Sequence, residues 1–235
     1  MKITAISVSV SICLAFALQA SAAPVALQSA TATFSQNLSA DFSVGRAIDG
    51  ITNDNLGWAI QGGTTNQTAA FQTVQDVGFK HGSLLTFSLI QNGIWYQPDT
   101  LGRFRISITT DDRSLFANGL ANGGDVTANW TVLHPIILDS ANGTTLTALR
   151  DGSILASGFL PQTDTYTIVA ATDLKGITGV RLEVLTDPSL PFDGPGREPD
   201  NGNFILSEFQ VSIDPFPEHH RRHHGRDFDH GPDRH

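Results

Sequence analysis

The stretch LGRFRISITT, residues 101–110, decides the fold class of this chain. Within it, apolar side chains from Phe104 to Ile108 alternate with polar ones from Arg103 to Ser107. Successive residues of a strand point to opposite faces of a sheet, so this alternation predicts a strand with one buried and one solvated face. Half-buried strands of this kind are typical of antiparallel sheets.

Similar β-rich runs fill most of the chain, and residues that favour turns separate them. The strand candidates are residues 69–77, 83–91, 102–110, 129–138, 144–150, 153–159, 164–172, 179–186 and 203–213. Almost none of them shows a helical period, and the tripeptide RDG at 150–152 lies between two candidates as a hairpin turn would. Many short strands closed by turns favour an all-β fold, an antiparallel β-sandwich of the jelly-roll kind, over an α/β fold.

Residues 1–22 have the pattern of a secretory signal peptide. A single lysine precedes an apolar run, and small residues follow it, which predicts cleavage near Ala22 or Ala23. The run is too short to span a membrane, and Cys13 follows Ile12 rather than the small residue that lipid attachment requires. We therefore expect a secreted or periplasmic protein with no membrane span.

Composition narrows the possible functions. The only cysteine and the only methionine lie in the signal peptide, so the mature chain has no disulfide, thiol nucleophile or thiolate metal site. About two hundred residues remain, enough for one domain with a sizeable core, which we place at 24–214. The net charge of -9 argues against a phosphate-binding surface, and hence against nucleic acid as a partner.

The composition changes abruptly at the C-terminal end. Residues 215–235 hold six of the eight histidines and almost nothing apolar, so we expect a disordered tail. Two histidine pairs in its HHRRHH stretch are four residues apart, namely His219 with His223 and His220 with His224. A transient helical turn would bring each pair to one nickel, zinc or copper ion. The alternative is a solvated, charged tail without a metal.

A second stretch, AIDGITNDNLGWAI at residues 47–60, carries five oxygen-bearing side chains between Asp49 and Asn55. It does not fit the helix-loop-helix calcium loop, which needs glycine where Asp54 stands and glutamate where Ile60 stands. Two interpretations remain. The side chains form Asx turns with their own backbone, or the tight turn supplies oxygens to a calcium ion in another geometry.

Several pieces of the chain, in order, carry a family pattern: ATFSQ at 32–36, the stretch at 47–60, LTFSLIQN at 85–92, LGRFRISITT at 101–110, GSILASG and DTYTI within 152–168, GITGVRLEVLTDPSLP at 176–191, and GPGREPDNGNFILSEFQV at 194–211. Together they resemble a discoidin-type (coagulation factor type C-like), galactose-binding-like β-sandwich domain. The likeness is greatest to the version in large secreted bacterial proteins that also carry cytochrome-c-like segments. The resemblance implies a jelly-roll sandwich, usually a non-catalytic binding module for sugars or surface polymers, often with a structural calcium ion.

The resemblance also implies ligands for that calcium ion. In such domains an aspartate of the DG pair, nearby loop oxygens and a glutamate of the last strand surround the ion. The corresponding residues here are Asp49, Asn53 or Asn55, and Glu208. Glu208 also invites a partner by itself, because it lies in an apolar strand. Trp58 is then expected in the core beneath this loop.

The connection QNGIWYQPDTLG, where close relatives tend to carry a glycine-rich turn, places Trp95 and Tyr96 in a loop expected to be exposed. Flat aromatic faces stack on sugar rings, and Arg103 and Arg105 on the following strand are near enough to add guanidinium donors. We therefore predict these four residues as the ligand site. Alternatively, the aromatic pair caps one end of the core and the arginines line a solvated strand face. Trp130 is expected in the core.

Few residues before the tail have the chemistry of catalysis. Asp111 and Asp112 are of the type that glycoside hydrolysis uses. Neighbouring strand residues face opposite sides, however, so a strand-end turn with Arg113 as counter-charge is favoured. His81 and His134 are expected in turns, and no nucleophile-elbow, zinc-protease or phosphate-loop motif is present.

The sequence thus favours an exported, non-catalytic binding module for carbohydrate or a cell-surface polymer, with a structural calcium site. Three alternatives belong to other classes. They are an adhesion or matrix protein that binds another protein, a metal-sequestering protein that uses the histidine-rich tail, and a glycosidase.

Overall fold

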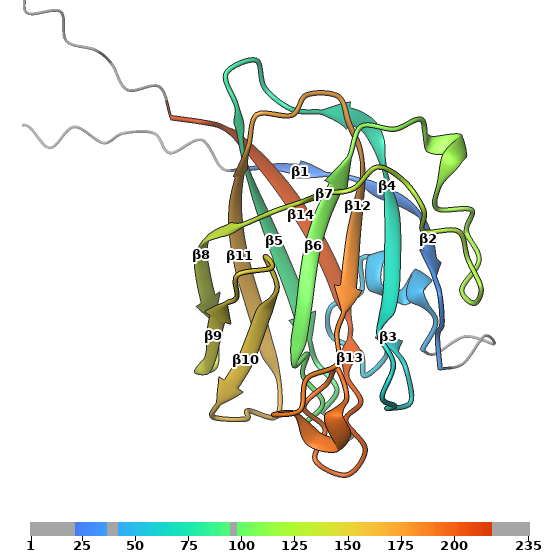
Figure 1. Ribbon diagram of the computed structural model, residues 1–235, viewed down its shortest axis with the longest axis vertical. Coiled ribbons are helices and arrows are strands. Elements are labelled where there is room, and N and C mark those ends of the chain that lie inside the picture. Colours follow the sequence, from blue (N-terminus) through green and yellow to red (C-terminus); the bar gives the residue numbers. More distant parts are fainter. Residues whose placement is uncertain (1–21, 37–41, 95–97, 218–235) are drawn as a thin grey trace, which may run out of the picture.

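The computed structural model describes residues 22–36, 42–94 and 98–217. In these residues the strands form two antiparallel sheets that face each other, as the two layers of ribbon in Figure 1 show. The all-β antiparallel sandwich that the strand pattern predicts, and that the discoidin-type resemblance implies, is therefore confirmed.

Each sheet has a strand order that differs from the order in the chain. The five-stranded sheet runs β1 (Ala23–Val25), β14 (Glu208–Pro215), β5 (Ser83–Gln91), β11 (Asp164–Thr172), β8 (Pro135–Ser140). The seven-stranded sheet runs β2 (Leu27–Ala32), β4 (Gln67–Val77), β12 (Ile177–Val184), β6 (Arg103–Thr109), β10 (Ile154–Gly158), β9 (Thr144–Ala148), and β7 (Thr131–Val132) also pairs with β6. A short ladder joins β3 (Trp58–Ala59) to β13 (Ile205–Leu206), and the 3-10 helices are η1 (Val44–Ile48), η2 (Arg113–Leu115) and η3 (Pro191–Asp193).

The strand boundaries follow the predicted ones where apolar and polar side chains alternate. Strands β5 and β11 coincide with the candidates at 83–91 and 164–172. Strands β9 and β10 form the expected hairpin, in which the N–H of Leu149 donates to the carbonyl of Ser153 at 2.7 Å across the RDG turn. Short-range alternation and turn chemistry were therefore sufficient signals for these elements.

Two strand candidates are each divided in two. The candidate at 129–138 becomes β7 and β8, because the chain crosses between the sheets there. The candidate at 203–213 becomes β13 and β14, separated by Ser207, whose N–H donates to the carbonyl of Ile90. The sequence pattern did not predict β1, β2 and β3, because two of them are very short and β2 has few β-branched or aromatic residues.

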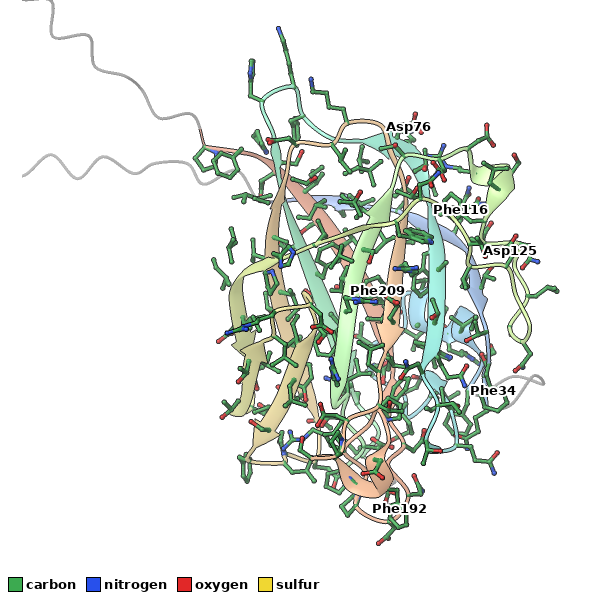
Figure 2. The ribbon with its side chains drawn as sticks, in the orientation of Figure 1. Phe34, Asp76, Phe116, Asp125, Phe192 and Phe209 are labelled. Atoms are coloured by element: carbon green, nitrogen blue, oxygen red, sulfur yellow. The ribbon has the colours of Figure 1, made fainter. Side chains whose placement is uncertain are left out.

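The core fills the space between the sheets. The ring of Phe209 lies 5.3 Å from that of Phe71 and 6.0 Å from that of Phe87, measured between centroids, and Figure 2 shows Phe209 inside the sandwich. Phe104 and Tyr166 stack at 6.0 Å. Burial of one such large apolar side chain contributes about 1.5–3 kcal/mol, so the alternation in the strands determines which faces meet.

A second apolar cluster lies on the outer face of the seven-stranded sheet. Phe116 and Trp130, from the connection between β6 and β7, pack edge to face with centroids 5.3 Å apart, and the cluster also contains Ala70 of β4. Trp130 is therefore half-buried on this outer face and not in the main core, contrary to expectation. The physical reason is that the connection folds back over the sheet, where the guanidinium of Arg181 lies 5.2 Å from the Trp130 ring centroid.

Candidate functional site

The long connections at one end of the sandwich enclose a small cavity. These connections, between β5 and β6 and between β12 and β13, lie at the lower end of Figure 1. The cavity has a volume of about 260 Å³ and is lined by Gln36, Phe42, Asp99, Glu198, Asn201, Asn203 and Ile205. We call it the loop-end cavity. Its described lining combines two carboxylates and three amides with two apolar side chains, and includes no cationic residue.

Backbone hydrogen bonds fix the position of Asp99 in this cavity. The N–H of Ile205 donates to the carbonyl of Asp99 at 2.9 Å, and the N–H of Arg197 donates to the carbonyl of Thr100 at 2.8 Å. Gly93 gives the carboxylate its space, because a Cβ at that position would lie 2.7 Å from Asp99 Oδ1. The β5–β6 connection and the segment around Arg197 and Ile205, which are distant in sequence, therefore fix the position of Asp99 together.

A tight turn presents Glu198 on the other side of the cavity. The N–H of Gly202 donates to the Glu198 carbonyl at 2.9 Å, and the N–H of Asp200 donates to Glu198 Oε2 at 3.0 Å. Gly202 has a φ of +73°, and a Cβ there would also meet the Pro191 carbonyl at 2.4 Å, so the turn needs glycine. These contacts fix the turn, and Glu198 lines the same cavity as Asp99.

The neighbouring Arg197 does not neutralise these carboxylates. Its guanidinium donates to Thr144 Oγ1 at 3.2 Å and to the carbonyls of Gly158 and Phe159 at 2.9 and 3.0 Å. These bonds tie the β12–β13 connection to β9 and β10. Arg197 is therefore a structural residue that anchors the loop.

Burial changes the pKa of the Asp99 carboxyl group in the loop-end cavity. Asp99 is only 3% exposed and Glu198 only 6%. Removal from water raises the pKa of Asp99 to about 7, its own backbone N–H opposes this shift, and the negative charge of Glu198 adds to it. Neither carboxylate has an ion-pair partner in the part of the chain that the structure describes.

Sequence reasoning assigned no role to Asp99 or Glu198. Both lie in connections that are rich in proline and glycine, and a single acid in such a loop usually contacts water. No local signal shows that the two loops meet. The nearest indication was the replacement of the expected glycine-rich turn by GIWYQPDT, which contains Asp99.

The residues predicted to bind a ligand have different outcomes. Trp95 and Tyr96 lie outside the described residues, so their role stays a prediction. Arg103 and Arg105 lie on the outer, polar face of β6 as the alternation requires, and both are engaged in ion pairs. Arg103 contacts Asp151 at 2.9 Å, and Arg105 forms a two-point pair with Glu183 at 2.8 and 2.9 Å.

Those ion pairs restrict what the two arginines can donate to a sugar. The two-point pair with Glu183 uses Nε and Nη2 of Arg105, and this guanidinium edge matches a carboxylate in geometry. Neither arginine lines the loop-end cavity. The geometry favours the alternative of a charged strand face, and a sugar contact by these arginines stays a prediction.

The acidic stretch at 47–60 forms Asx turns and also approaches Glu208. Asp49 Oδ1 accepts from the N–H of Ile51 at 2.9 Å, while Asp49 Oδ2 pairs with Arg46 at 3.2 Å. The N–H of Gly50 donates to Glu208 Oε2 at 3.2 Å. The two interpretations of this stretch are therefore compatible, because the turns bring the loop to the glutamate that the resemblance singles out.

The environment of Glu208 suits an oxygen-bound cation. Glu208 is 5% exposed, and burial, together with the charges of Asp49 and Asp54, raises its pKa to about 7 against the Gly50 hydrogen bond. Asp49 and Glu208 both line a groove of about 490 Å³ beside β1 and β14. Of the other predicted ligands, Asn55 is buried and Asn53 is exposed.

The donor set is nevertheless incomplete. Within the described residues, no group of three or more His, Cys, Asp or Glu side chains lies close enough to hold a metal ion. A calcium ion takes about six to eight oxygens, including amide and backbone carbonyls. Asp49 and Glu208, which line one groove, have the oxygen chemistry that calcium takes, and the calcium site with Asn53 or Asn55 stays a prediction.

The candidate glycosidase pair does not converge. Asp111 accepts hydrogen bonds from the backbone and side chain of Asn129, whereas Asp112 caps η2 by accepting from the N–H of Ser114 at 2.8 Å. These bonds confirm the turn interpretation. Arg113 pairs with Asp76 at 2.7 Å, so its main partner differs from the one expected.

The remaining aromatic and histidine predictions agree with the structure. Trp58 is fully buried, donates from Nε1 to the carbonyl of Phe34 at 3.0 Å, and packs edge to face on Phe204. His81 lies in the turn between β4 and β5, and His134 lies in the connection between β7 and β8. Neither histidine reaches the loop-end cavity.

Several predictions fall on the two ends of the chain. The signal peptide and the four metal-binding histidines of the tail lie outside the described residues, apart from Ala22, so these assignments stay predictions. In the described part, no helix is long and apolar enough to cross a membrane.

Comparison with known proteins gives structural likeness only. No protein-family model and no curated protein matches the chain. One similar solved structure is CBM32-3 from a family 31 glycoside hydrolase of Clostridium perfringens, with 11% identity and a TM-score of 0.43 over 77% of this chain and 86% of that chain. Another comes from the Streptococcus pneumoniae beta-galactosidase BgaA, with 12% identity and a TM-score of 0.45 over 82% of this chain and 92% of that chain.

Proposed function

We propose that the chain is a non-catalytic binding domain for a carbohydrate or a carbohydrate-like surface polymer, with the loop-end cavity as its ligand site. One observation carries the proposal: a polar cavity of about 260 Å³, built by loops at one end of a rigid sandwich. Binding sites commonly consist of loops that a rigid scaffold positions. The volume lies just below the usual range for drug-sized ligands, so the cavity suits a group as large as one sugar unit.

The lining of the cavity supports this ligand class. A sugar ring offers several hydroxyl donors and one apolar face. Asp99 and Glu198 supply carboxylate acceptors, which form the stronger kind of hydrogen bond, and Phe42 supplies an apolar wall. Trp95 and Tyr96 belong to the same connection as Asp99, and in this proposal they extend the site by stacking.

A structural calcium ion completes the proposal. Asp49, Asn55 and Glu208 would hold it together with backbone oxygens, and it would neutralise the acidic groove beside β14. Its role would be to fix the loop at 47–60 against the last strand. That loop lies directly before β3, whose partner β13 carries Ile205 of the loop-end cavity.

One observation favours a second candidate function, glycoside hydrolysis. Asp99 and Glu198 are two buried carboxyl groups, and one of them has a pKa near 7, as the general acid of a glycosidase requires. Release of reducing ends from a polysaccharide panel tests this directly. Turnover that Asp99→Asn abolishes would replace the binding proposal, and we expect none.

The binding proposal is tested with a glycan array and calorimetry on the mature chain, with calcium present. Asp99→Asn and Trp95→Ala should each reduce affinity for the accepted glycan at least tenfold, which corresponds to about 1.4 kcal/mol. Asp139→Asn is the matched control, because Asp139 is an exposed acid on β8.

Three results would count against this assignment. The absence of binding to any glycan, together with capture of a protein on a protein array, would favour the adhesion alternative. Unfolding of Trp95→Ala in a melting experiment would make the aromatic pair a structural cap. Retention of full affinity by Asp99→Asn would place the ligand outside the loop-end cavity.

A further inference from the structure

Among the described residues that line the loop-end cavity, two are carboxylic acids and none is cationic. Asp99 and Glu198 are 97% and 94% buried, given exposures of 3% and 6%. The nearest cationic residue in sequence, Arg197, directs its guanidinium to Thr144 and to backbone carbonyls. A buried carboxylate without a cation is costly, so the cavity must take up a proton or a positively charged group.

The Asp99 carboxylate is available to a ligand. Asp99 lines the cavity, and within the described residues its own backbone N–H is the one hydrogen-bond donor to its carboxylate. Glu198 uses Oε2 for the N–H of Asp200, which leaves Oε1. Two acceptors from two different loops therefore face the same space.

The other oxygens of the cavity are already occupied. Asn203 Oδ1 accepts from the N–H of Ile60, Asn201 Oδ1 accepts from the N–H of Asn203, and Gln36 Oε1 accepts from both Gln61 and Asn203. A metal ion such as calcium requires about six to eight oxygens, which this arrangement does not offer. An ammonium group requires about three acceptors on one side and tolerates carbon on the other.

The size and the wall of the cavity agree with an organic cation. A volume of about 260 Å³ exceeds what a single ion fills, and Phe42 and Ile205 provide apolar surface for a carbon skeleton. An ammonium group between two carboxylates, in a place that water reaches poorly, forms strong charge-assisted hydrogen bonds.

We propose that the loop-end cavity recognises a primary ammonium group, so that the preferred ligand is a polysaccharide containing amino sugars with free amines. This inference rests on the proposed carbohydrate-binding function and makes it more specific. Asp99 and Glu198 accept hydrogen bonds from the ammonium group, and Phe42 and Ile205 contact the sugar ring that carries it. An N-acetylated sugar lacks the positive charge and leaves both carboxylates uncompensated.

Calorimetry with two matched oligosaccharides tests the inference. The glucosamine tetramer should bind the mature chain at least tenfold more tightly than the N-acetylglucosamine tetramer at pH 7. Asp99→Asn and Glu198→Gln should each remove most of that preference, because each should weaken binding of the glucosamine tetramer far more than binding of the acetylated tetramer. Asp139→Asn should keep the full preference, which excludes a general attraction of the acidic protein for cations. Melting curves confirm that each variant is folded.

Two further probes separate the competing explanations. Tetralysine carries the same number of side-chain amines without a sugar, and it should bind weakly and independently of Asp99. Equal loss of tetralysine binding in Asp99→Asn would overturn the sugar assignment in favour of a cationic peptide. Calcium chloride alone should give no signal that depends on Glu198, and a signal that does would make the cavity a metal site.

The outcomes also distinguish this inference from the function on which it rests. Equal affinity for the two tetramers, lowered to the same extent in Asp99→Asn and Glu198→Gln, would overturn the ammonium preference and leave the binding function intact. Failure to bind either tetramer or any other glycan would overturn both.

Discussion

Asp99 and Glu208 are carboxylic acids that the fold removes from water without an ion pair from any described residue. In both, burial is the largest cause that raises the pKa to about 7. Asp112 shows the opposite shift, because hydrogen bonds from the side chain and the backbone of Ser114 lower its pKa. Buried carboxylates with high pKa values cluster at functional sites, which is why these two positions define the candidate sites.

The raised pKa of Asp99 predicts a pH-dependent stability. An unfolded aspartate titrates near pH 3.9, whereas folded Asp99 titrates near 7, so between these values the folded state binds more protons. The contribution of Asp99 to the free energy of unfolding should therefore fall as pH rises from about 4 to about 7, by up to about 1.4 kcal/mol per pH unit, and remain level above that.

Urea denaturation across this pH range, without ligand, measures the effect. Asp99→Asn should be more stable than the original chain at pH 7, and the difference should vanish near pH 4. A difference that does not change with pH would mean that Asp99 is ionised throughout. The exposed Asp139→Asn variant is the control.

Calcium should stabilise the fold through Asp49 and Glu208. A ligand that binds only the folded state at a hundredfold excess over its Kd adds about 2.7 kcal/mol to the free energy of unfolding. The Tm should therefore fall on chelation, and Asp49→Ala and Glu208→Gln should abolish that response. Glu208→Gln should also melt higher than the original chain in chelator, because it removes a buried charge.

Protein shown to be metal-free by elemental analysis provides the control for this prediction. If the melting curve of that protein does not change when calcium is added, the loop at 47–60 forms Asx turns only. The hydrogen bond from Gly50 to Glu208 would then be its whole connection to β14.

At the level of elements, Gly179 of β12 decides where the connection between β6 and β7 lies, because it leaves space for the Phe116 ring. Phe116 lies against the outer face of the seven-stranded sheet at Gly179 of β12, and Figure 2 shows Phe116 on this side of the molecule. The smaller cluster with Ala70 and Trp130 depends on that space. The outer face of β12 thus has a structural partner over Gly179 and a charged surface around Glu183.

Gly179→Ala should destabilise the domain by about 1–3 kcal/mol, because the added Cβ would lie 2.4 Å from the Phe116 ring. In a Phe116→Ala background the same substitution should cost much less, since the ring is absent and the nearest remaining atom, the Phe71 carbonyl oxygen, lies 3.2 Å from the added Cβ. Chemical denaturation of the four chains gives this coupling. Gly45→Ala is the control, because a Cβ at Gly45 would have no neighbour closer than 3.8 Å. Equal costs in both backgrounds would show that Phe116 does not occupy this space.

At the level of the whole molecule, the last strand leads the chain away from the loop-end cavity. The loop-end cavity lies at one end, while β14 finishes at the opposite end, as Figure 1 shows, where the N–H of Phe216 donates to the carbonyl of Gly82. Pro217, the last described residue of the chain, is therefore at the end of the sandwich opposite the loop-end cavity.

Removal of residues 218–235 should abolish nickel and zinc binding and leave folding and glycan affinity unchanged. The last described residues, up to Pro217, stay in the shortened chain, so β14 is intact. Calorimetry with each metal on both chains measures the change. Histidine must be neutral to bind metal, so binding should weaken as pH falls below about 6.5. Equal metal uptake by the shortened chain would exclude the tail as the site.

The sequence by itself determined the fold class and most strands. The alternation in 101–110 and in the strands that became β5 and β11 is a local property, because each side chain's face follows from its position in the strand. The buried position of Trp58 and the turn role of Asp112 could also be predicted, since each depends on near neighbours in the chain. The link between the DG loop and Glu208 needed the family resemblance in addition.

Only the tertiary structure decided which loops meet. Asp99 and Glu198 belong to connections that follow different strands, and each alone has the pattern of an ordinary polar loop residue. These two residues are buried because β5 and β12 end on the same side of the sandwich, so that the connections after them meet. The same meeting raises the pKa of Asp99, and it directs the guanidinium of Arg197 to the carbonyl of Gly158 and not to the carboxylates. The strand pattern fixes faces but not the pairing of distant strands, because burying apolar area is non-directional and several sheet orders would satisfy the same alternation.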